Sequence, residues 1–572
     1  MKKVMSYFKV YKKEAILAPL CKLLEASLEL LIPILVSNII DHGIANSDKG
    51  YIIRMVIIMV LCGFVGLGFS ILGQFFSAKC AVGFSSKLRS DLFKKLQSLS
   101  FSEIDNLGTS SMITRMTSDV NQVQTGINLS LRLLLRSPFV VFGAAIMGTV
   151  LAPNISYIYW IAIPVLSIVI FGIIFSTMPL HKHTQEDLDN VLGDTRENLA
   201  GTRVVRAFTM ENDEIKNYKL KTKKLERSQN KASNISNLMN PLTYIIINIA
   251  IVLLIYLGGL KVDIGDLTQG QVIALYNYMS QILIELIKLA NLIITIAKAI
   301  ACAKRIEKVL DIDTTVNITD DKKINDNYIE YNHVTLTYKG ASEPSLEDIN
   351  FSVKKGETIG IIGSTGSGKS SIVHLIPRFY EATCGQVILN GKDITSYDVE
   401  ELRSRVGIVM QKAVLFEGTI KENIKWGKKD ATDEEILKAC EISQSMDIIN
   451  KKEKGINSFV EQSGRNFSGG QRQRLSIARA LVRKPEILIL DDSSSALDYA
   501  TDAALRKAIK SLDYHPTVFI VSQRTASIQN ADKILVLDDG KMMGFDTHDN
   551  LLKNCQVYQE IYYSQFKKGG NN

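Results

Sequence analysis

Six long apolar segments fill the first 300 residues of this 572-residue chain, and they constrain its fold more than any other feature. A helix needs about 20 predominantly apolar residues to cross the hydrocarbon core of a bilayer. The segments that meet this length lie near Ala15–Ile40, Ile53–Phe76, Leu133–Leu151, Ile155–Met178, Pro241–Leu260 and Gln271–Ile296. We therefore expect residues 1–310 to form an all-α membrane domain with six spans.

The polar connections between these spans alternate in length. Those after the second and fourth spans have about fifty and about sixty residues, whereas the others are short. Because Lys and Arg accumulate on the cytoplasmic side, we place the long connections and both termini in the cytoplasm. The helical pattern continues through these connections, so the helices should extend beyond the bilayer. The richness in Lys, Ile and Asn indicates a bacterial plasma-membrane protein.

Charged residues lie inside the predicted spans. Lys22, Glu25 and Glu29 lie in the first span, and Glu285 and Lys288 lie in the sixth. Charge within hydrocarbon is costly and usually faces a partner or a wet cavity, which indicates a translocation pathway. Alternatively, the charges neutralise each other locally, because Lys22/Glu25 and Glu285/Lys288 are each three residues apart on one helix face. The sequence leaves both interpretations open.

The chain changes character after residue 310. Residues 311–327 are polar and lack apolar periodicity, which predicts a linker. From residue 328 to residue 572, short β-rich runs alternate with helical segments, a pattern typical of an α/β domain. The expected strands are Gly360–Ile362, Gln386–Leu389, Ile487–Leu490, Val518–Val521 and Lys533–Leu537.

The net charge of +8 does not indicate a nucleic-acid partner. The basic residues gather in the predicted cytoplasmic connections, and no basic stripe or base-stacking motif accompanies them. The seven cysteines form no C-x-x-C pair, which argues against a zinc site or a disulfide framework.

A phosphate-binding loop lies in the second domain. Gly363-Ser-Thr-Gly-Ser-Gly-Lys-Ser370 matches G-x-x-x-x-G-K-[ST] without a mismatch. An apolar strand at Thr358–Ile362 precedes it, and a helical segment at Ser371–Phe379 follows. The glycines allow backbone N–H groups to face phosphate oxygens, and the helix N-terminus favours an anion. The sequence therefore predicts an ATP site.

Three residues are expected to reach the phosphates and their metal ion. Lys369 should contact the β- and γ-phosphates, and the Ser370 hydroxyl should bind Mg²⁺. Asp491 ends the apolar strand that begins at Glu486, and we expect it to bind the same Mg²⁺ through water.

Further motifs resemble those of ABC transporter ATPases. Phe467-Ser-Gly-Gly-Gln471 is similar to the L-S-G-G-Q signature, with Phe in place of Leu. Gln411–Ile424 resembles the Q-loop of the exporter branch, and Ser495-Ala-Leu-Asp498 resembles the D-loop. Tyr338 fits the aromatic residue that stacks on adenine. Six spans ahead of one such domain resemble a half-transporter, so the resemblance covers nearly the whole chain.

The resemblance implies a head-to-tail dimer in which each ATP lies between the P-loop of one chain and the signature of the other. The residues expected at this chain's ATP are Tyr338, Gly363, Ser364, Thr365, Gly366, Ser367, Gly368, Lys369, Ser370, Ser371 and Gln411, with Ser370, Gln411 and Asp491 at Mg²⁺. Those expected at the partner's ATP are Phe467, Ser468, Gly469, Gly470 and Gln471, beside the D-loop residues Ser495 and Asp498. The resemblance also implies short coupling helices, which we place near Ser102–Asn106 and Arg206–Glu211.

Two positions depart from the family pattern. The general base, usually Glu, is Asp492, whose shorter side chain retracts the carboxylate by about 1.5 Å, and a misplacement on the order of 1 Å can cost about 100-fold. The switch position, usually His, is Gln523, which lacks an imidazole. Both changes affect hydrolysis and leave the binding residues intact, a combination that resembles the degenerate-site subunit of heterodimeric multidrug exporters.

Several alternatives remain for the function. The chain could export lipids or peptides, act as a homodimer, or bind ATP only to gate a conformation. The aromatic residues Phe139, Tyr157, Trp160, Tyr244 and Tyr276 suit hydrophobic compounds, but they equally suit lipid-facing or packing positions. A soluble or DNA-associated ATPase is disfavoured by the six spans.

Overall fold

The computed structural model describes residues 2–312 and 327–566, so the predicted linker at 311–327 lies mostly outside the described residues. The chain divides into two compact units. One comprises Met1–Gln97 and Ser110–Ile312, and the other comprises Ser98–Thr109 and Asp313–Asn572.

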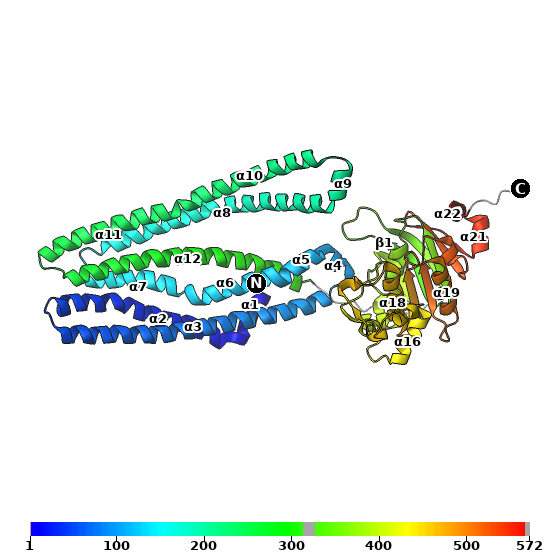
Figure 1. Ribbon diagram of the computed structural model, residues 1–572, viewed down its shortest axis with the longest axis horizontal. Coiled ribbons are helices and arrows are strands. Elements are labelled where there is room, and N and C mark those ends of the chain that lie inside the picture. The colour runs from blue at the N-terminus through cyan, green and yellow to red at the C-terminus, as the bar shows by residue number, and fades with distance from the viewer. Residues whose placement is uncertain (1, 313–326, 567–572) are drawn as a thin grey trace. The chain divides into compact units, whose positions relative to one another are not determined.

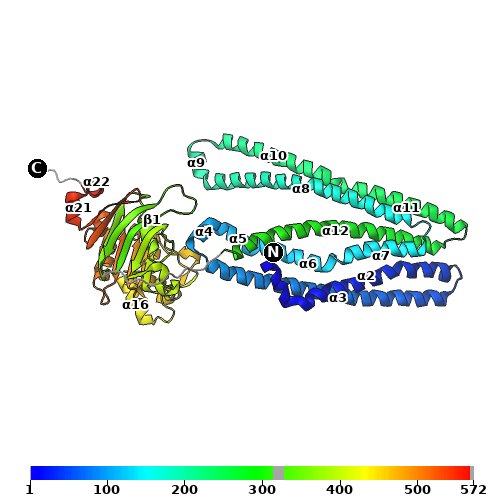
Figure 2. The ribbon, with the colours of Figure 1, turned by 180° about the vertical axis from the view of Figure 1, so that it is seen from behind.

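The first unit is helical. Its elements are α1 (Lys2–Ser6), η1 (Tyr7–Tyr11), α2 (Lys12–Asn38), η2 (Ile39–Ile44), α3 (Lys49–Gln97), α5 (Thr109–Thr114), η3 (Arg115–Asp119), α6 (Val120–Leu133), α7 (Arg136–Leu151), α8 (Tyr157–Ala200), α9 (Thr202–Ala207), α10 (Glu211–Asn237), α11 (Met239–Asp263) and α12 (Gln269–Leu310). Figures 1 and 2 show α2 beside α3, and α8 beside α10 and α11.

Within the described residues, six helical stretches are long and apolar enough to cross a membrane. They are Lys3–Ile44, Lys49–Gln97, Thr109–Leu151, Tyr157–Ala200, Glu211–Asp263 and Gln269–Leu310. The six-span prediction is therefore confirmed. The fourth stretch begins two residues later than expected, because Ile155 lies in the turn that joins α7 to α8. All six stretches extend beyond the apolar segments, as the uninterrupted helical patterns predicted.

Two buried tyrosines lie in the core that α2, α7, α8, α11 and α12 share. Tyr159 on α8 donates its hydroxyl to the carbonyl of Leu275 at 2.7 Å, and Tyr278 on α12 donates to that of Leu30 at 2.6 Å. A buried phenol needs such an acceptor, so each tyrosine ties two helices together while filling the core.

The second unit is an α/β domain. Its strands are β1 (Ile329–Leu336), β2 (Leu346–Val353), β3 (Thr358–Gly363), β4 (Cys384–Leu389), β5 (Lys392–Asp393), β6 (Val406–Val409), β7 (Gly418–Thr419), β8 (Phe459–Val460), β9 (Ile487–Asp491), β10 (Thr517–Val521), β11 (Lys533–Asp538) and β12 (Lys541–Asp546). Its helices are α4 (Phe101–Leu107), α13 (Lys369–Leu375), η4 (Ile394–Ser396), α14 (Val399–Arg405), α15 (Ile420–Lys425), α16 (Asp433–Ile442), α17 (Met446–Asn450), η5 (Gly455–Asn457), η6 (Gln462–Gly464), α18 (Gly469–Leu481), α19 (Tyr499–Lys510), α20 (Thr525–Ile528), α21 (His548–Asn554) and α22 (Gln556–Gln565).

The main sheet has the order β12-β11-β3-β10-β9-β6, in which every strand except β12 is parallel to its neighbours. Strands β9 and β10 are buried along their whole length, as expected for parallel strands covered on both faces. A second sheet has the order β2-β1-β4-β5. All five strands expected from the sequence are present, as β3, β4, β9, β10 and β11.

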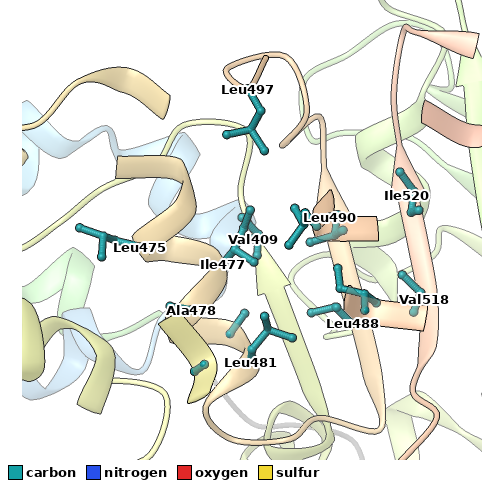
Figure 3. Close-up of a cluster of buried hydrophobic side chains, with 14 of the residues drawn as sticks. Val409, Leu475, Ile477, Ala478, Leu481, Leu488, Leu490, Leu497, Val518 and Ile520 are labelled. Atoms are coloured by element: carbon teal, nitrogen blue, oxygen red, sulfur yellow. The ribbon is translucent and has the colours of Figure 1, made fainter. Parts of the chain in front are cut away.

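One face of the main sheet packs against α18. Figure 3 shows Leu475, Ile477, Ala478 and Leu481 of this helix together with Val409 of β6, Leu488 and Leu490 of β9, and Val518 and Ile520 of β10. This packing fixes the signature at the start of α18 relative to the strand ends.

A close helix contact in the first unit generates a stability prediction. Gly126 of α6 is buried, and a Cβ placed there would collide with the Cβ of Ala299 on α12. Gly126→Ala should therefore destabilise the protein by about 1–3 kcal/mol through overpacking, despite a gain in helix propensity of about 1 kcal/mol. The midpoint of thermal unfolding of the purified chain in detergent should fall.

Gly172 of α8 provides the matched control, since a Cβ there meets no heavy atom within 4 Å. Gly172→Ala should leave the midpoint unchanged or raise it. Equal midpoints for the two variants would show that α6 and α12 do not depend on this contact.

Candidate functional site

The ends of four neighbouring parallel strands gather the residues that the sequence assigned to ATP. Strand β3 leads into the P-loop, β10 leads to Gln523, β9 ends at Asp491 and β6 leads to Gln411. Because parallel strands in one sheet have their carboxyl ends at the same edge, these residues meet although they are far apart in the chain.

The P-loop turns sharply before α13. Gly366 and Gly368 have φ values of 88° and 89°, a conformation that side chains with a Cβ rarely adopt. Lys369 folds back over this turn, and its ammonium donates to the carbonyls of Gly363 at 3.0 Å and Ser364 at 2.5 Å. Burial lowers the pKa of Lys369, although the carboxylates of Asp492 and Asp491, at the end of β9, oppose the shift. A bound phosphate could replace these two carbonyls as the hydrogen-bond partner of the Lys369 ammonium.

The remaining hydroxyls of the loop differ in exposure. Ser364 and Thr365 are exposed, and Ser364 Oγ lies 3.4 Å from Asp538 Oδ1. Ser367 Oγ is buried and has no hydrogen-bond partner among the described residues.

Two of the three residues expected to bind Mg²⁺, Ser370 and Asp491, are in direct contact. Ser370 Oγ donates to Asp491 Oδ1 at 2.8 Å, and Asp491 is only 2% exposed. Gln411 reaches the same strand end. A hydroxyl, a carboxylate and an amide supply oxygen ligands, which Mg²⁺ prefers. This donor set therefore fits a magnesium ion bound with ATP phosphates.

Asp492 lies immediately beyond this pair. Its backbone has a φ of 45°, and its N–H donates to the carbonyl of Val521 at 3.0 Å. Its carboxylate oxygen Oδ2 accepts a hydrogen bond from Gln411 Nε2 at 3.2 Å. Burial raises the pKa of Asp492, and the neighbouring Asp491 adds to that shift, although the Gln411 hydrogen bond opposes it.

Gln523 follows β10 at the same edge, and its side chain is exposed. Its backbone carbonyl accepts a hydrogen bond from Gln565 Nε2 at 2.7 Å. The Oε1 atom of Gln565 in turn accepts from the N–H of Thr525 at 2.8 Å. Gln565 thus holds the backbone of the switch position. No motif in the sequence marks it, because it lies 40 residues beyond Thr525.

The signature residues begin α18. Ser468 caps the helix, since its Oγ accepts from the N–H of Gln471 and its N–H donates to Gln471 Oε1. Gly469 and Ser468 are exposed, whereas Phe467 is buried in the core cluster with the Lys452 ammonium 4.9 Å from its ring centre. The substitution of Phe for Leu therefore keeps an apolar anchor beneath an accessible helix N-terminus.

The D-loop packs against both the signature and the Asp492 turn. A Cβ on Gly470 would lie 2.8 Å from the carbonyl oxygen of Ala496, so this position requires glycine. Ser495 Oγ donates to the carbonyl of Asp492 at 2.8 Å. Asp498 caps α19, where its carboxylate accepts from the N–H of Thr501 at 2.9 Å.

Tyr338, the expected adenine-stacking residue, lies beside the helix that follows the P-loop. Its hydroxyl hydrogen-bonds with Ser371 Oγ at 2.9 Å, and its ring packs edge-to-face on Tyr380 at 4.9 Å. Burial raises the pKa of Tyr338. The structure thus brings Tyr338 and Ser371 together, and it adds Tyr380, which the sequence analysis did not identify.

The comparisons with known proteins decide the family. Residues 15–286 match the model of the ABC transporter transmembrane region, and residues 346–495 match the ABC transporter model. The chain is 36% identical to the ABC transporter ATP-binding protein YfiB of Bacillus subtilis (strain 168), with 100% of both chains covered. The chain belongs to the ABC transporter family.

Two further ABC proteins are similar over nearly the whole chain. The ATP-dependent lipid A-core flippase of Yersinia pestis bv. Antiqua (strain Antiqua) is 28% identical, with 97% of this chain and 96% of the relative covered. A bacterial Atm1-family ABC exporter with ATP bound superposes with a TM-score of 0.82 at 22% identity, covering 98% of this chain and 100% of the other. The exporter fold is confirmed, and the chain is an ATP-binding, multi-pass membrane transporter of a type that works as a dimer.

The two expected coupling helices of this ABC transporter have different outcomes. Helix α4 (Phe101–Leu107) contains the predicted segment Ser102–Asn106. The second prediction is displaced, since the short helix is α9 (Thr202–Ala207) rather than Arg206–Glu211. Gly201 ends α8, so α9 begins at Thr202, ahead of the predicted start at Arg206.

The intramembrane charges of this transporter pair both within and between helices. Lys22 donates to Glu25 Oε2 at 2.6 Å and to Ser70 Oγ of α3 at 3.1 Å. Lys288 donates to Glu285 Oε1 at 2.7 Å. Local neutralisation therefore occurs at both pairs, as one of the two interpretations predicted.

Arg136, at the start of α7, adds a cation that the sequence analysis did not include among the span charges. Its guanidinium donates to Glu285 Oε1 at 2.8 Å and to Glu29 Oε2 at 2.6 Å. Ser137 Oγ donates to Glu285 Oε2 at 2.8 Å. The resulting charge network joins α2, α7 and α12, and alternates in sign from Glu29 to Lys288. Arg136 and Glu285 are buried, whereas Glu29 and Lys288 remain partly exposed.

This network generates a second prediction. Arg136→Met leaves the buried Glu285 carboxylate without its guanidinium and should cost about 3–5 kcal/mol of stability. Adding Glu285→Gln should restore part of that loss, because no buried carboxylate then lacks its partner. Thermal unfolding of the purified transporter measures both effects.

Lys182→Met is the surface control, since Lys182 and Glu186 form an exposed pair at 3.9 Å. Such pairs contribute about 0–1 kcal/mol. If Lys182→Met lowered the stability of the transporter as much as Arg136→Met does, the charge network would not stabilise the protein more than a surface ion pair.

Proposed function

We propose that this chain is one half of a heterodimeric ABC exporter that expels hydrophobic or amphipathic compounds across the bacterial plasma membrane. Residues 1–310 would form its membrane domain and residues 328–572 its ATPase domain, with both termini in the cytoplasm. Its own P-loop site binds ATP and Mg²⁺ but hydrolyses ATP weakly. Its signature completes a competent site on a different half-transporter.

The observation that carries this proposal is the placement of Asp492. A general base must lie within hydrogen-bond reach of the attacking water, at about 2.6–3.2 Å. The Asp side chain is about one C–C bond shorter than that of Glu, so its carboxylate lies further from the expected water. Its Oδ2 atom also already accepts a hydrogen bond from Gln411 Nε2 at 3.2 Å. Ser370, Asp491 and Lys369 nevertheless keep the arrangement needed to hold a nucleotide. Binding and hydrolysis are therefore separable at this site.

Gln523 supports the same division. Its amide can donate a hydrogen bond to a γ-phosphate oxygen, but it offers no imidazole to orient both the phosphate and the water. Its exposed side chain is at the strand edge where Asp491 and Asp492 lie, so both departures from the family pattern affect one catalytic step.

The signature of this chain supports the second half of the proposal. Ser468 and Gly469 are exposed at the N-terminus of the 13-residue helix α18, with free access for an anion. Phe467 and Gly470 anchor this N-terminus to the core and the D-loop. A partner's ATP would therefore meet a well-anchored signature that is intact apart from Phe467.

The transport cycle follows from this asymmetry. ATP binding at both sites would draw the two ATPase domains together, and the coupling helices would pass that motion to the spans, which then open outward. Hydrolysis at the partner's P-loop would reset the spans. ATP retained at the weak site would keep the domains in contact between cycles.

The substrate class rests on the spans. Phe139, Tyr157, Trp160, Tyr244 and Tyr276 are exposed on this chain, so apolar rings are available to a hydrophobic compound. Multidrug export is the form of this function that we adopt. Lipid export is the second candidate, because a relative 28% identical is named as an ATP-dependent lipid A-core flippase.

The proposal generates a third prediction. Asp492→Glu combined with Gln523→His should restore a competent site and raise hydrolysis at this P-loop by on the order of 100-fold. Vanadate trapping of nucleotide on this chain, in a complex with its partner half-transporter, measures the gain.

The control is the same pair of changes together with Lys369→Ala, which should abolish trapping because the phosphates lose their cation. Unchanged trapping in the double variant would remove the basis for a degenerate site. Brisk ATPase activity of a homodimer of the unaltered chain would contradict the proposal as well.

A further inference from the structure

The charge network of α2, α7 and α12 lies inside apolar stretches, yet it reaches the surface at Glu29 and at Lys288. The Glu29 side chain is 37% exposed and the Lys288 side chain is 44% exposed, whereas Arg136 and Glu285 between them are buried. A charge that meets hydrocarbon is costly, so these two groups require water or a polar ligand at this depth. The network therefore presents one negative and one positive end on the surface of the spans.

Both ends retain the capacity to bind a further partner. Among the described residues, Glu29 accepts a hydrogen bond from Arg136 through Oε2, and Lys288 donates one to Glu285. A carboxylate and an ammonium can each take part in several hydrogen bonds. A ligand can therefore bind to Glu29 and Lys288 without breaking the buried pairs.

The buried part of the network is not fully satisfied. Arg136 Nε has no hydrogen-bond partner among the described residues, and neither has Gln281 Oε1, which lies one turn before Glu285 on α12. A polar network that serves stability alone is expected to satisfy its buried donors and acceptors. These two atoms therefore argue against a purely structural role for the network.

The total charge of the network decides which kind of ligand fits. Glu29 and Glu285 are acidic, Arg136 and Lys288 are basic, and the four charges sum to zero. A ligand with a single charge would leave a net charge among apolar helices, which is unfavourable. A zwitterion keeps the sum at zero, with its ammonium at Glu29 and its anionic group at Lys288.

Apolar side chains flank both ends of the network. Ile284 lies one turn before Lys288 on α12, and Phe139 lies one turn after Arg136 on α7, so each shares a helix face with a charged residue. Both side chains are exposed. Apolar surface beside the charges suits the chain or ring of an amphiphile.

We propose that Glu29 and Lys288 bind the head of a zwitterionic amphiphile, a molecule with an ammonium, a phosphate or carboxylate, and an apolar body. The ammonium contacts Glu29, the anionic group contacts Lys288, and the buried Arg136–Glu285 pair holds the two ends in place. The inference rests on the proposed function, and it names the class of hydrophobic or amphipathic compound that this part of the spans accepts. Lipid headgroups and synthetic zwitterions share this chemistry.

The experiment compares four amphiphiles. Lysophosphatidylethanolamine and N-dodecyl-β-alanine are zwitterions of lipid and synthetic origin, whereas dodecylamine has only the ammonium and dodecyl phosphate only the anion. The full-length chain with its partner half-transporter is kept in dodecyl maltoside, a detergent without charge, and no ATP is added. Binding of each radiolabelled compound is measured by scintillation proximity, and the signal from detergent alone is subtracted.

The unaltered chain should bind both zwitterions at least about 10-fold more tightly than dodecylamine or dodecyl phosphate, because each zwitterion gains a second hydrogen bond to a charged group. A preference for lysophosphatidylethanolamine alone would assign the site to a lipid headgroup, and one for N-dodecyl-β-alanine alone would assign it to a carboxylate compound. Similar affinities for all four compounds would overturn the inference, and this comparison needs no variant.

Two variants test the two ends separately. Glu29→Gln should lower the affinity for zwitterions by about 10-fold, the value of one hydrogen bond to a charged group, and it should make dodecyl phosphate bind better than dodecylamine. Lys288→Gln should lower it equally and reverse that preference. A merely structural role would shift the midpoint of thermal unfolding without such a reversal, so its absence in folded variants would contradict the inference.

Glu186→Gln is the matched control, because it removes a carboxylate from an exposed pair with Lys182 on α8. It should leave all four affinities unchanged. A loss of zwitterion binding equal to that of Glu29→Gln would overturn the inference, since binding would then follow the total charge of the chain.

The inference and the proposed function fail in different ways. If zwitterions bind as expected but the complex exports nothing with ATP, the proposed function is contradicted and the binding site stands. If the complex exports uncharged hydrophobic compounds and shows no preference for zwitterions, the binding site is contradicted and the proposed function stands.

Discussion

The parallel pairing of β3, β10, β9 and β6 is the constraint on which the nucleotide site depends. The register places Val521 beside both Ile361 and Asp491, and Leu490 beside Val409. The segments that leave these strands must therefore emerge at one edge. The P-loop, Gln523, the Asp491–Asp492 pair and Gln411 come from four distant parts of the chain, and the strand pairing gathers them at one edge, where Ser370 bonds Asp491 and Gln411 bonds Asp492. Because α18 packs on β6, β9 and β10, the same sheet also positions the signature at the start of this helix.

At that edge, the side chains divide into two groups. Lys369, Ser370 and Asp491 are buried or paired with each other, and they form a set that can hold phosphates and a divalent cation. Asp492 and Gln523 follow the ends of β9 and β10, at the positions that the resemblance to ABC ATPases assigns to hydrolysis. Under the proposed function, a change confined to Asp492 and Gln523 would alter the rate of hydrolysis and leave ATP affinity largely unchanged. This separation is the basis of our proposal that the chain keeps its P-loop and, apart from Phe467, its signature, while a partner carries out the catalytic step.

Much of this could be predicted from sequence, for physical reasons that differ by element. The six spans follow from the length of apolar helix that a bilayer requires, and the P-loop follows from the spacing of Gly363, Gly368 and Lys369. The buried strands β9 and β10 were visible as apolar runs. Strands β1 and β2 were not predicted, because their buried and exposed positions alternate irregularly.

Residues defined by long-range contacts were missed. Arg136 lies near the start of the third predicted span, yet it pairs with Glu285, 149 residues away. Tyr380 meets Asp105 across 275 residues, and Gln565 meets the carbonyl of Gln523 from the last described helix. No local pattern encodes such pairs. The second short helix lies earlier than predicted for a local reason, since Gly201 ends α8 and α9 begins at Thr202.

The fate of the γ-phosphate on this chain tests the central claim most directly. The complex with its partner would be allowed to turn over 8-azido-ATP labelled either at the α- or at the γ-phosphate, and then photo-crosslinked and separated by chain. We predict equal retention of both labels on this chain, because its site holds unhydrolysed ATP, and loss of the γ-label on the partner. Loss of the γ-label on both chains to the same extent would contradict a weak site at Asp492 and Gln523.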